Sequence, residues 1–456
     1  MGDGKMTDNG KGGKMKEVLD RYRDLSAQSQ ALFRRAERVM PGGIGHSFRY
    51  HWPYPVYAVR AKGSKFWDVD GNEYVDLWMA HYARITGHAP DFIIDELARK
   101  LSDGIHVGIV NEYEVEFAEM LCEIVRSAEK VRFCCTGTEA TMYAVRLARG
   151  YTDRKMILKI EGGWHGPNPD LMHKINIPLE SAESLGLLPE ISEYTKTLPF
   201  NDIEGAMRVI EETADDLAGV IIEPIPGTGF IPPDPRYLKA LREETSKVGA
   251  LLIFDEIITG FRLSLGGGQE EFGIKPDLTT LGKIAGGGMP IGIVAGRKDI
   301  MDMCDHTKRP NRWERVNIGG GTFSGIPMAM IAGLLQVQYL KENAHWIYPR
   351  LKEMGERVRK GTEEAFRQNG ISARCYGYGS LYQVAFPLDK NERLMSPRDI
   401  LDRTDSHKRD VEYKLRMMNE GVFVVKGGGA ISTEHSEEDI EKIIRASQKV
   451  AREMGS

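Results

Sequence analysis

The feature that most constrains this chain is a repeated alternation of apolar, β-branched runs with helical stretches, between about residues 105 and 330. Because the runs are apolar on both faces, they predict strands that are covered on both sides. Helices that alternate with such strands indicate an α/β domain with a mostly parallel sheet flanked by helices. Ligands of such sheets bind at the carboxyl ends of the strands. The predicted strands are residues 130–134, 155–160, 218–222, 251–254 and 291–295.

The bulk composition excludes several classes of protein. The chain has 456 residues, 41% hydrophobic and 28% charged, which is typical of a globular protein with a large core and more than one domain. A net charge of −5 without a long basic run argues against a nucleic-acid partner. No apolar stretch predicts a membrane span or a signal peptide, and five scattered cysteines predict neither a disulfide framework nor a metal site. We therefore expect a cytoplasmic protein without a metal ion and without a membrane partner.

The chain is expected to form two domains after a flexible tail of residues 1–14, which is rich in Gly, Lys and Asp. A helix is predicted over residues 15–40, and three short strands over residues 56–60, 65–69 and 74–77 predict a small antiparallel sheet. The C-terminal part again mixes helices with short strands. We expect it to pack with the N-terminal part as a smaller α+β domain, with residues 15–75 and 336–456 in the smaller domain and residues 76–335 in the large one.

The most informative motif is a lysine, Lys283, in the small and apolar stretch from residue 281 to 290. Burial of a lysine disfavours the charged form, lowers its pKa and leaves a nucleophilic amine. Such an amine can form a Schiff base with a carbonyl cofactor. Pyridoxal phosphate (PLP) needs this lysine and an acid that keeps its pyridine nitrogen protonated. Asp255, at the end of an apolar strand, is the candidate acid, so the pair predicts a PLP site.

Polar motifs follow other predicted strands, and each has a purely structural alternative. Gly137 and Thr138 open a predicted helix whose free amide groups suit a phosphate, although an ordinary capping turn shows the same pattern. Trp164 and His165 follow the next strand, and the indole could stack on a flat cofactor or fill the core. Glu223 ends a third strand, where it could orient hydrogen bonds of a ring or a water molecule, or fix a loop through a salt bridge.

Two further residues complete the predicted cofactor site. Ile257 lies on the same side of its strand as Asp255 and could pack under a cofactor ring. Thr322 lies in the glycine-rich loop of residues 319–325, before an apolar helix, and could bring its hydroxyl to a phosphate. Asp255 has a structural alternative too, because a buried Arg or Lys would also satisfy it. Each pattern is weak evidence alone.

In their order along the chain, these motifs resemble those of the class III (ω-type) aminotransferases, which are PLP enzymes of fold type I. The resemblance runs from about residue 40 to 435. It is strongest to the glutamate-1-semialdehyde aminomutase subgroup and extends to D-phenylglycine and β-phenylalanine aminotransferases. The motifs that carry it are Pro41-Gly42-Gly43, Asp68-Val69-Asp70-Gly71, Gly137-Thr138-Glu139-Ala140-Thr141-Met142, Arg146-Leu147-Ala148-Arg149-Gly150-Tyr151-Thr152, Phe254-Asp255-Glu256, Thr259-Gly260-Phe261-Arg262 and Pro276-Asp277-Leu278-Thr279-Thr280-Leu281-Gly282-Lys283.

The resemblance implies a role for each of these residues. Lys283 would carry the Schiff base and shuttle the proton, and Asp255 would pair with the pyridine nitrogen. Trp164 stands where the family usually has a Tyr or Phe stacked on the ring. Phosphate contacts are implied for Gly137 and Thr138 of one subunit and for Thr322 of the neighbouring subunit. The resemblance therefore implies a homodimer with shared active sites.

Three positions bear on the substrate. Arg49 matches the position whose Arg binds the substrate carboxylate in the aminomutases, although a surface loop arginine is the alternative. His81 lies in a segment that departs from the aminomutase type and resembles D-phenylglycine aminotransferase; a structural histidine is equally compatible with its pattern. Lys426 falls where aromatic-α- and β-amino-acid aminotransferases have an Arg, and the aminomutase Glu expected around Gly427 is missing.

These departures favour an aminotransferase that moves an amino group from a carboxylate-bearing amino acid, of an aromatic or β type, to a 2-oxo acid. The alternative is glutamate-1-semialdehyde 2,1-aminomutase, which moves the amino group within one molecule. Racemase or decarboxylase chemistry on the same scaffold is a lesser alternative. A PLP-binding protein without catalysis is disfavoured, because Lys283 and Asp255 are both present.

Overall fold

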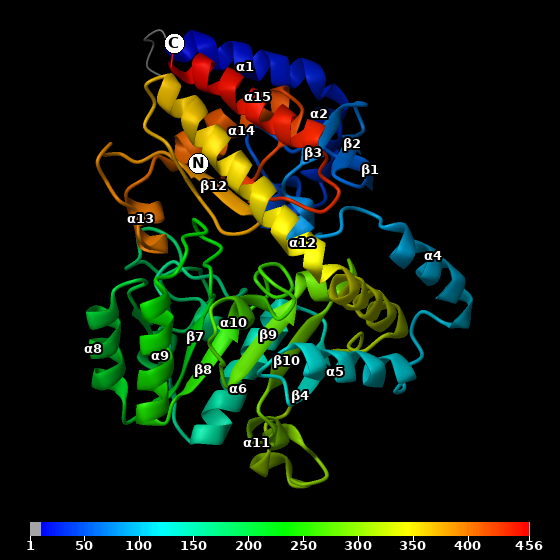
Figure 1. Cartoon of the computed structure of the whole chain (residues 1–456), viewed down its shortest axis with the longest axis vertical. Coiled ribbons are helices and arrows are strands. Elements are labelled where there is room, and N and C mark those ends of the chain that lie inside the picture. Colours follow the sequence, from blue (N-terminus) through cyan, green and yellow to red (C-terminus); the bar gives the residue numbers. More distant parts are fainter. Residues whose placement is uncertain (1–10, 456) are drawn as a thin grey trace.

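The computed structural model describes residues 11–455, and a seven-stranded sheet forms the centre of its larger half (Figure 1). Six strands run parallel to one another, and β10 is antiparallel to both of its neighbours. This arrangement confirms the predicted mostly parallel sheet. In spatial order the strands are β4 (Lys130–Cys134), β10 (Gly292–Gly296), β9 (Leu278–Gly282), β8 (Leu251–Asp255), β7 (Leu217–Ile222), β5 (Met156–Ile160) and β6 (Thr195–Leu198).

The five predicted runs correspond to strands β4, β5, β7, β8 and β10, whereas β6 and β9 were not predicted. Strand β9 was not predicted because Thr279 and Thr280 interrupt its apolar pattern. Both side chains are nevertheless fully buried. Their hydroxyls have partners inside the sheet, Ser127 at 2.7 Å for Thr279 and the Asp255 carboxylate at 3.1 Å for Thr280. Satisfied hydroxyls therefore let a polar-looking segment occupy the centre of the sheet.

Helices cover both faces of this sheet, and the alternation of side chains along each strand decides which helix they meet. On one face, Ile253 of β8 packs in a cluster with α6 (Gly137–Thr152). On the other face, Leu252 and Phe254 of the same strand pack with α8 (Ile203–Thr213) and α9 (Pro235–Val248). Further helices are α4 (Asp91–Lys100), α5 (Glu112–Ile124), α7 (Ile191–Tyr194), α10 (Gly267–Glu271), α11 (Lys298–Met301) and α13 (Pro397–Asp402).

The N-terminal part forms two helices rather than the single predicted one, α1 (Lys11–Leu25) and α2 (Ala27–Ala36). The break lies at Ser26, whose side-chain oxygen donates to the carbonyl of Tyr22 and whose φ of −136° is not helical. The predicted antiparallel sheet is present as β1 (Ala58–Lys62), β2 (Lys65–Asp68) and β3 (Glu73–Asp76).

Segments from the C-terminal part join this N-terminal sheet. Strand β13 (Val422–Phe423) pairs in parallel with β3, and α14 (Lys414–Asn419) packs against α1. Helix α15 (Glu437–Gly455) packs against α14, and Figure 1 shows α1 and α15 away from the large sheet. A separate three-stranded sheet consists of β11 (Arg374–Tyr376), β12 (Leu381–Ala385) and β14 (Gly428–Ala430).

A single helix, α12 (Pro327–Gln368), connects the two regions. It contacts α5 near the large sheet and α15 near the N-terminal sheet, and it runs without a break through residues 335 and 336, where a domain border was predicted. The division of the chain into domains stays a prediction. The predicted tail lies mostly outside the described residues, and α1 already begins at Lys11. No helix between residues 11 and 455 combines the length and apolar character that a bilayer span requires.

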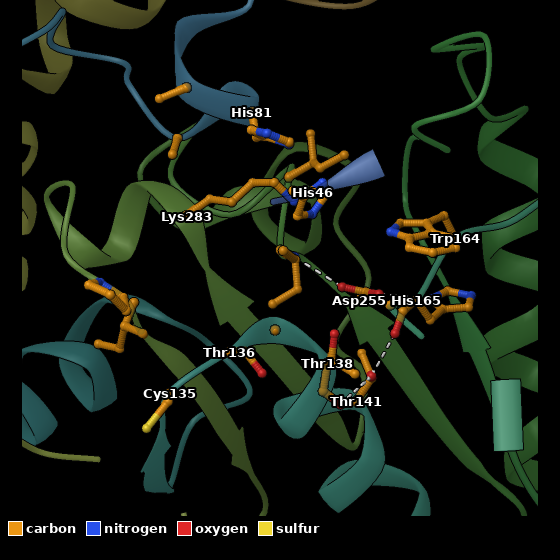
Figure 2. Close-up of a pocket in the computed structure, with 18 of the residues that line it drawn as sticks. His46, His81, Cys135, Thr136, Thr138, Thr141, Trp164, His165, Asp255 and Lys283 are labelled. Atoms are coloured by element: carbon orange, nitrogen blue, oxygen red, sulfur yellow. Dashed lines mark hydrogen bonds and ion pairs between the residues drawn. The ribbon is translucent and has the colours of Figure 1, made fainter. Parts of the chain in front are cut away.

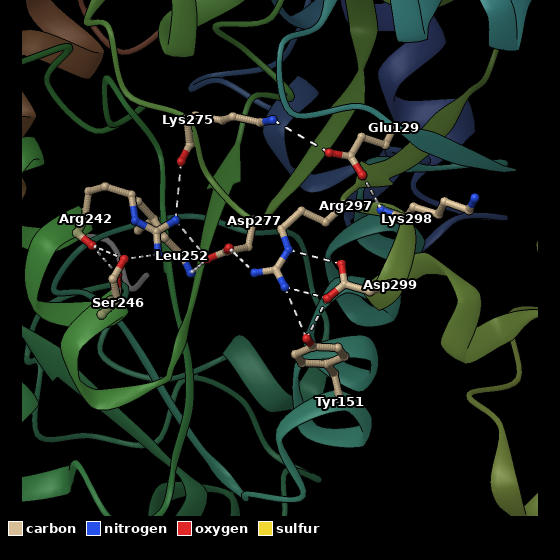
Figure 3. A network of polar contacts seen from close by, with 11 residues as sticks. Glu129, Tyr151, Arg242, Ser246, Leu252, Lys275, Asp277, Arg297, Lys298 and Asp299 are labelled. Atoms are coloured by element: carbon tan, nitrogen blue, oxygen red, sulfur yellow. Dashed lines mark hydrogen bonds and ion pairs between the residues drawn. The ribbon is translucent and has the colours of Figure 1, made fainter.

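A buried carboxylate anchors the start of β9, the strand that precedes Lys283. Asp277 is 6% exposed and accepts hydrogen bonds from Arg242, Arg297 and the amide of Leu252 on the neighbouring strand (Figure 3). Arg297 also binds Asp299, and this ion pair raises the pKa of Arg297 further. Asp277 therefore links the beginnings of β8 and β9 to two arginines from other elements.

We expect Asp277→Ala to lower the free energy of unfolding by about 2 kcal/mol, because it leaves two partly buried guanidinium groups without their shared acid. The change can be measured by urea denaturation. Asp299→Ala is the matched control, since Asp299 binds the same Arg297 but its side chain is 49% exposed. That variant should lose less than about 1 kcal/mol. Equal losses of unfolding free energy in the two variants would show that Asp277 stabilises the fold no more than the exposed Asp299 does.

Candidate active site

A cavity of about 520 Å³ lies at the carboxyl ends of the parallel strands and brings together most of the predicted site (Figure 2). Its walls come from the residues that follow β4, β5, β7, β8 and β9, as the strand pattern predicted. Ten of the twelve predicted site residues line it: Arg49, His81, Gly137, Thr138, Trp164, His165, Glu223, Asp255, Ile257 and Lys283.

Lys283 directly follows β9 and begins a short 3₁₀ turn, η5 (Lys283–Gly286). Its φ of 45° lies in the left-handed region, which is strained for a residue with a side chain. Burial lowers its pKa to about 8, and the acids Asp255 and Glu223 partly oppose this shift. Low pKa alone does not identify a nucleophile, because burial lowers the pKa of Lys159 and Lys414 to about 8 as well. Of these three lysines, Lys283 is the one that lines the pocket.

Asp255 ends β8 and is 3% exposed. Its Oδ2 lies 2.7 Å from Nδ1 of His165, and its Oδ1 accepts from the amide of Ile257 and the hydroxyl of Thr280, each at 3.1 Å. A carboxylate offers about four acceptor sites, so these contacts leave room for one more donor. The alternative partner considered for Asp255, a buried Arg or Lys, does not appear among its hydrogen bonds within residues 11–455.

Glu223 follows β7 and holds two loops by backbone contacts. Its two carboxylate oxygens accept from the amides of Trp164, at 2.9 Å, and Gly227, at 2.8 Å. Burial raises its pKa, while the nearby His165 lowers it. The structural role considered for Glu223 is therefore present, although it works through amide groups rather than a salt bridge.

The N-terminus of α6 faces the same pocket through Gly137 and Thr138. Thr136 caps the helix, since its hydroxyl accepts from the amide of Glu139 at 3.1 Å. The first amide groups of a helix lack partners within the helix and favour an anion. Ile257 packs so closely against Gly137 that a Cβ there would lie 2.9 Å from its Cδ1. A glycine is thus required for the helix end to approach the strand that carries Asp255.

His81 reaches the pocket from a left-handed turn that the sequence analysis missed. The four residues of this turn, α3 (Met79–Tyr82), have φ values between 43° and 65°, although none is a glycine. Such a turn is costly for L-residues, about 1–2 kcal/mol for each. Asp76 stabilises its start by accepting from the amide of Trp78 at 2.8 Å, and Arg262 donates to the carbonyl of Tyr82 at 2.6 Å. No glycine or proline marks the turn, so the sequence contains no signal for it.

The surroundings of His81 keep it neutral. Burial lowers its pKa to about 4, and the nearby His46 and Arg49 lower it further. Its ring lies 5.1 Å from that of His46, which also lines the pocket and was not among the predicted residues. The Nε2 of His81 is buried and has no hydrogen-bond partner among the described residues. It is therefore available to a bound molecule as a donor or an acceptor, according to its tautomer.

The structure does not bring Thr322 or Lys426 into the pocket of the single chain. Thr322 has an exposed side chain in the loop before α12. Lys426 places its Nζ 4.7 Å from the centre of the Phe48 ring, and Phe48 in turn meets Trp164 edge-on at 5.7 Å. Lys426 thus lies one aromatic ring away from the pocket wall, and the proposed phosphate contact of Thr322 would have to come from a second subunit.

These residues fit PLP. A lysine of lowered pKa and a buried acid with a free acceptor site lie in one pocket, together with a helix N-terminus that suits a phosphate and an aromatic side chain that suits a ring. The fold and the site therefore define a PLP-dependent enzyme of fold type I. The chain belongs to the class III aminotransferase family, whose model matches residues 48–433, and PLP is its cofactor.

The chain is similar to several known proteins of this family. It is 39% identical to the glutamate-1-semialdehyde 2,1-aminomutase of Methanosarcina acetivorans, over 92% of this chain and 97% of that one. It is 35% identical to an omega-transaminase of Sphaerobacter thermophilus, with a TM-score of 0.86 over 94% and 98% of the two chains. It is 30% identical to a β-phenylalanine aminotransferase of Variovorax paradoxus, with a TM-score of 0.84 over 96% of each chain.

We expect reduction of the holoenzyme with sodium borohydride to leave the cofactor attached to the peptide that contains Lys283, because this amine faces the pocket. Peptide mapping by mass spectrometry locates the label. Lys283→Ala should lose the label and the visible absorbance of the bound cofactor. Lys159→Ala is the control and should keep both, since Lys159 donates to the carbonyl of His173 instead. A label on Lys159 or Lys414 would contradict the assignment.

The pH dependence of labelling adds a second test. Since the pKa of Lys283 is lowered to about 8, about half of the amine is neutral at that pH and most of it about one pH unit above. The rate at which PLP labels the apoenzyme should therefore rise through pH 8 and level off near about pH 9. A rate that keeps rising toward pH 10 would indicate a lysine with an unshifted pKa.

Proposed function

We propose that this enzyme transfers an amino group of a carboxylate-bearing substrate, with PLP held by Lys283. The observation that carries the proposal is the juxtaposition of Lys283 and Asp255, which end the neighbouring strands β9 and β8 and face one pocket together with Arg49. An arginine fork suits a carboxylate. Within the described part of the chain no acid is hydrogen-bonded to Arg49, so its guanidinium is available to a substrate.

The chain's own residues have distinct tasks in such a reaction. Bound PLP supplies an electron-accepting ring. Asp255, held by His165 and Thr280, offers a fixed negative charge to the ring nitrogen. The amine of Lys283 is neutral above about pH 8, so its Nζ can accept the Cα proton of the substrate and return it. Arg49 orients the substrate through its carboxylate.

The same residues could serve two reactions, transfer of the amino group within one molecule or transfer to a 2-oxo acid. The names of the relatives support the intramolecular transfer better. Curated relatives between 35% and 39% identical carry the name glutamate-1-semialdehyde 2,1-aminomutase. Such an enzyme returns the amino group to the same molecule and needs no second substrate. This support rests on overall similarity, which includes the cofactor site that all members of the family share.

Intermolecular transfer to a 2-oxo acid is the second candidate, and the substrate side of the pocket favours it. His81 and Lys426 depart from the aminomutase pattern, and His81 stands in the pocket with a neutral ring. Two solved structures, 35% and 30% identical, are named an omega-transaminase and a β-phenylalanine aminotransferase. Because His81 lies in the pocket with Arg49, the residue proposed to bind the substrate carboxylate, we give the aminotransferase reaction priority over the overall similarity.

The two reactions can be separated by one panel of assays. We expect the holoenzyme to convert α- or β-amino acids with pyruvate or 2-oxoglutarate into new amino acids, detected by chromatography. The control is glutamate-1-semialdehyde incubated alone. Its isomerisation without a second substrate, combined with no transfer from the amino acids, would establish the aminomutase reaction instead. No turnover in either assay would overturn amino transfer itself.

The exposed loop of Thr322 supports the proposed homodimer. Phe323 is 61% exposed and its ring lies 5.3 Å from His106, which belongs to a stretch with several exposed apolar side chains. Monomers rarely expose such a patch, and its residues suit an interface with a second copy. In that dimer Thr322 could reach the phosphate site of the partner. The apolar members of the patch are Ile105, Val107, Ile109, Val110 and Phe323.

We expect Phe323→Asp to weaken the dimer and to lower the affinity for PLP, because it places a charge in an apolar contact beside the proposed phosphate ligand. Sedimentation velocity and the absorbance of bound cofactor measure the two effects. Leu185→Asp, a change at a fully exposed leucine outside the patch, should alter neither. A monomeric wild type with full cofactor occupancy would contradict the shared site.

A further inference from the structure

A second cavity of about 530 Å³ adjoins the cofactor pocket, and we call it the side chamber. The two cavities share Arg49, Ala80 and His81, so they meet at the left-handed turn and at the arginine proposed to bind the carboxylate. The side chamber lies between the segment of residues 40–58, the N-terminal sheet and β13. Its wall is largely aromatic and apolar, and includes Phe48, Val56, Tyr57, Phe66, Trp78 and Phe423.

One wall of the side chamber carries a largely buried lysine that forms no ion pair with an acid of the described residues. Lys414, the first residue of α14, is 5% exposed, and its Nζ lies 5.2 Å from the centre of the Phe423 ring. Within residues 11–455, this Nζ makes the ring contact but no hydrogen bond or ion pair. A buried ammonium group without an acid or a carbonyl is costly, and a ligand anion would remove that cost.

Two acids, one a turn before Lys414 and one in the wall of the side chamber, are already bound to other groups. Asp410, one turn earlier, is bound by two nitrogens of Arg409 at 2.8 and 2.9 Å. Asp76 also lines the side chamber, but it accepts from the amides of Trp78 and Met79 and lies 2.7 Å from Nε2 of His88. The side chamber therefore keeps an excess of positive charge, with Lys414 in its wall and Arg49 at its junction with the pocket.

The side chamber is an apolar cavity with Lys414 in its wall and Arg49 at its junction with the pocket, and these features favour one kind of ligand. Rings in the wall suit an aromatic or long apolar side chain, which such a cavity binds by excluding water. Arg49 suits a carboxylate at the end that reacts, and Lys414 suits a second anionic group at the other end. A short, wholly polar substrate would leave the aromatic wall unused and Lys414 unpaired.

We propose that the side chamber binds the side chain of the amino-group donor, and that this donor is an amino acid with an aromatic or long apolar side chain that ends in an anionic group. The proposal rests on amino transfer in the adjoining pocket and deepens it, because it names the substrate class. The carboxylate next to the amine binds Arg49, the apolar body lies among the aromatic rings, and the terminal anion binds Lys414.

Binding is tested with the holoenzyme and two probes that lack an amine and cannot react, 3-(4-carboxyphenyl)propanoate and 3-phenylpropanoate. In calorimetric titrations we expect the dianion to bind the wild type about tenfold more tightly than the monoanion, as expected for one more hydrogen bond between charged groups. Lys414→Met should abolish this difference by weakening the dianion alone. Ala61→Phe should weaken both probes, because Ala61 lines the side chamber and a ring there fills it.

Lys159→Met is the matched control, since Lys159 is another buried lysine but binds the carbonyl of His173 away from the side chamber. It should leave both affinities unchanged, and a loss equal to that of Lys414→Met would overturn the proposal as a general effect of removing a buried lysine. Failure of both probes to bind, or equal binding by the wild type, Lys414→Met and Ala61→Phe, would overturn it too.

Turnover separates the side chamber from the proposed reaction. With 4-carboxyphenylalanine as the donor, Lys414→Met should lower kcat/KM about tenfold, while kcat/KM for alanine stays unchanged. If the enzyme transfers the amino group of alanine but the probes do not bind as expected, the proposed function stands and the proposed role of the side chamber is wrong. Probe binding that follows the expected pattern without any transfer would support the side chamber as a ligand site and overturn the proposed reaction.

Discussion

The active site depends on one buried carboxylate, that of Asp255 at the end of β8. A carboxylate with 3% exposure is tolerated only if its oxygens are paired, and His165, Thr280 and the amide of Ile257 pair them. These partners come from three segments, so satisfying one charge also fixes the loop after β5, the strand β9 and the start of the chain after β8. Lys283 follows β9 directly, and its position relative to Asp255 is therefore set by the sheet.

The substrate side of the pocket has a different physical basis. Here the backbone itself is strained, because the four residues from Met79 to Tyr82 adopt left-handed φ values without a glycine. Strain of this kind persists only where surrounding contacts over-determine it. Asp76 holds the start of the turn and Arg262 holds its end, and both side chains are nearly fully buried. Contacts with the buried side chains of Asp76 and Arg262 thus offset the backbone strain of the turn that places His81 in the pocket.

The sequence predicts residues at strand ends better than residues on the strained turn. Lys283, Asp255 and Gly137 were predictable because they stand at strand ends, where apolar patterning and sheet topology define the position of a side chain. Strand β9 was missed because its buried threonines look polar, and the break at Ser26 because a distant residue stabilises the new helix start: Asp70 accepts from the amides of Gln28 and Ser29. The turn at His81 was unpredictable, since only tertiary contacts stabilise it. Thr322 and Lys426 lie outside the pocket of one chain, and their proposed roles depend on contacts beyond it.

The same division explains why similarity identifies the cofactor more firmly than the substrate. The residues proposed to contact the cofactor lie at strand ends in the core, where a change would also disturb the sheet and the partners of Asp255. Arg49 and His81 lie in a short turn and in the strained turn, and the wall of the side chamber comes from the N-terminal sheet and the segments around it, so changes there leave the large sheet intact. The choice between returning an amino group and exchanging it is proposed to depend on this second group of residues, which the large sheet does not constrain.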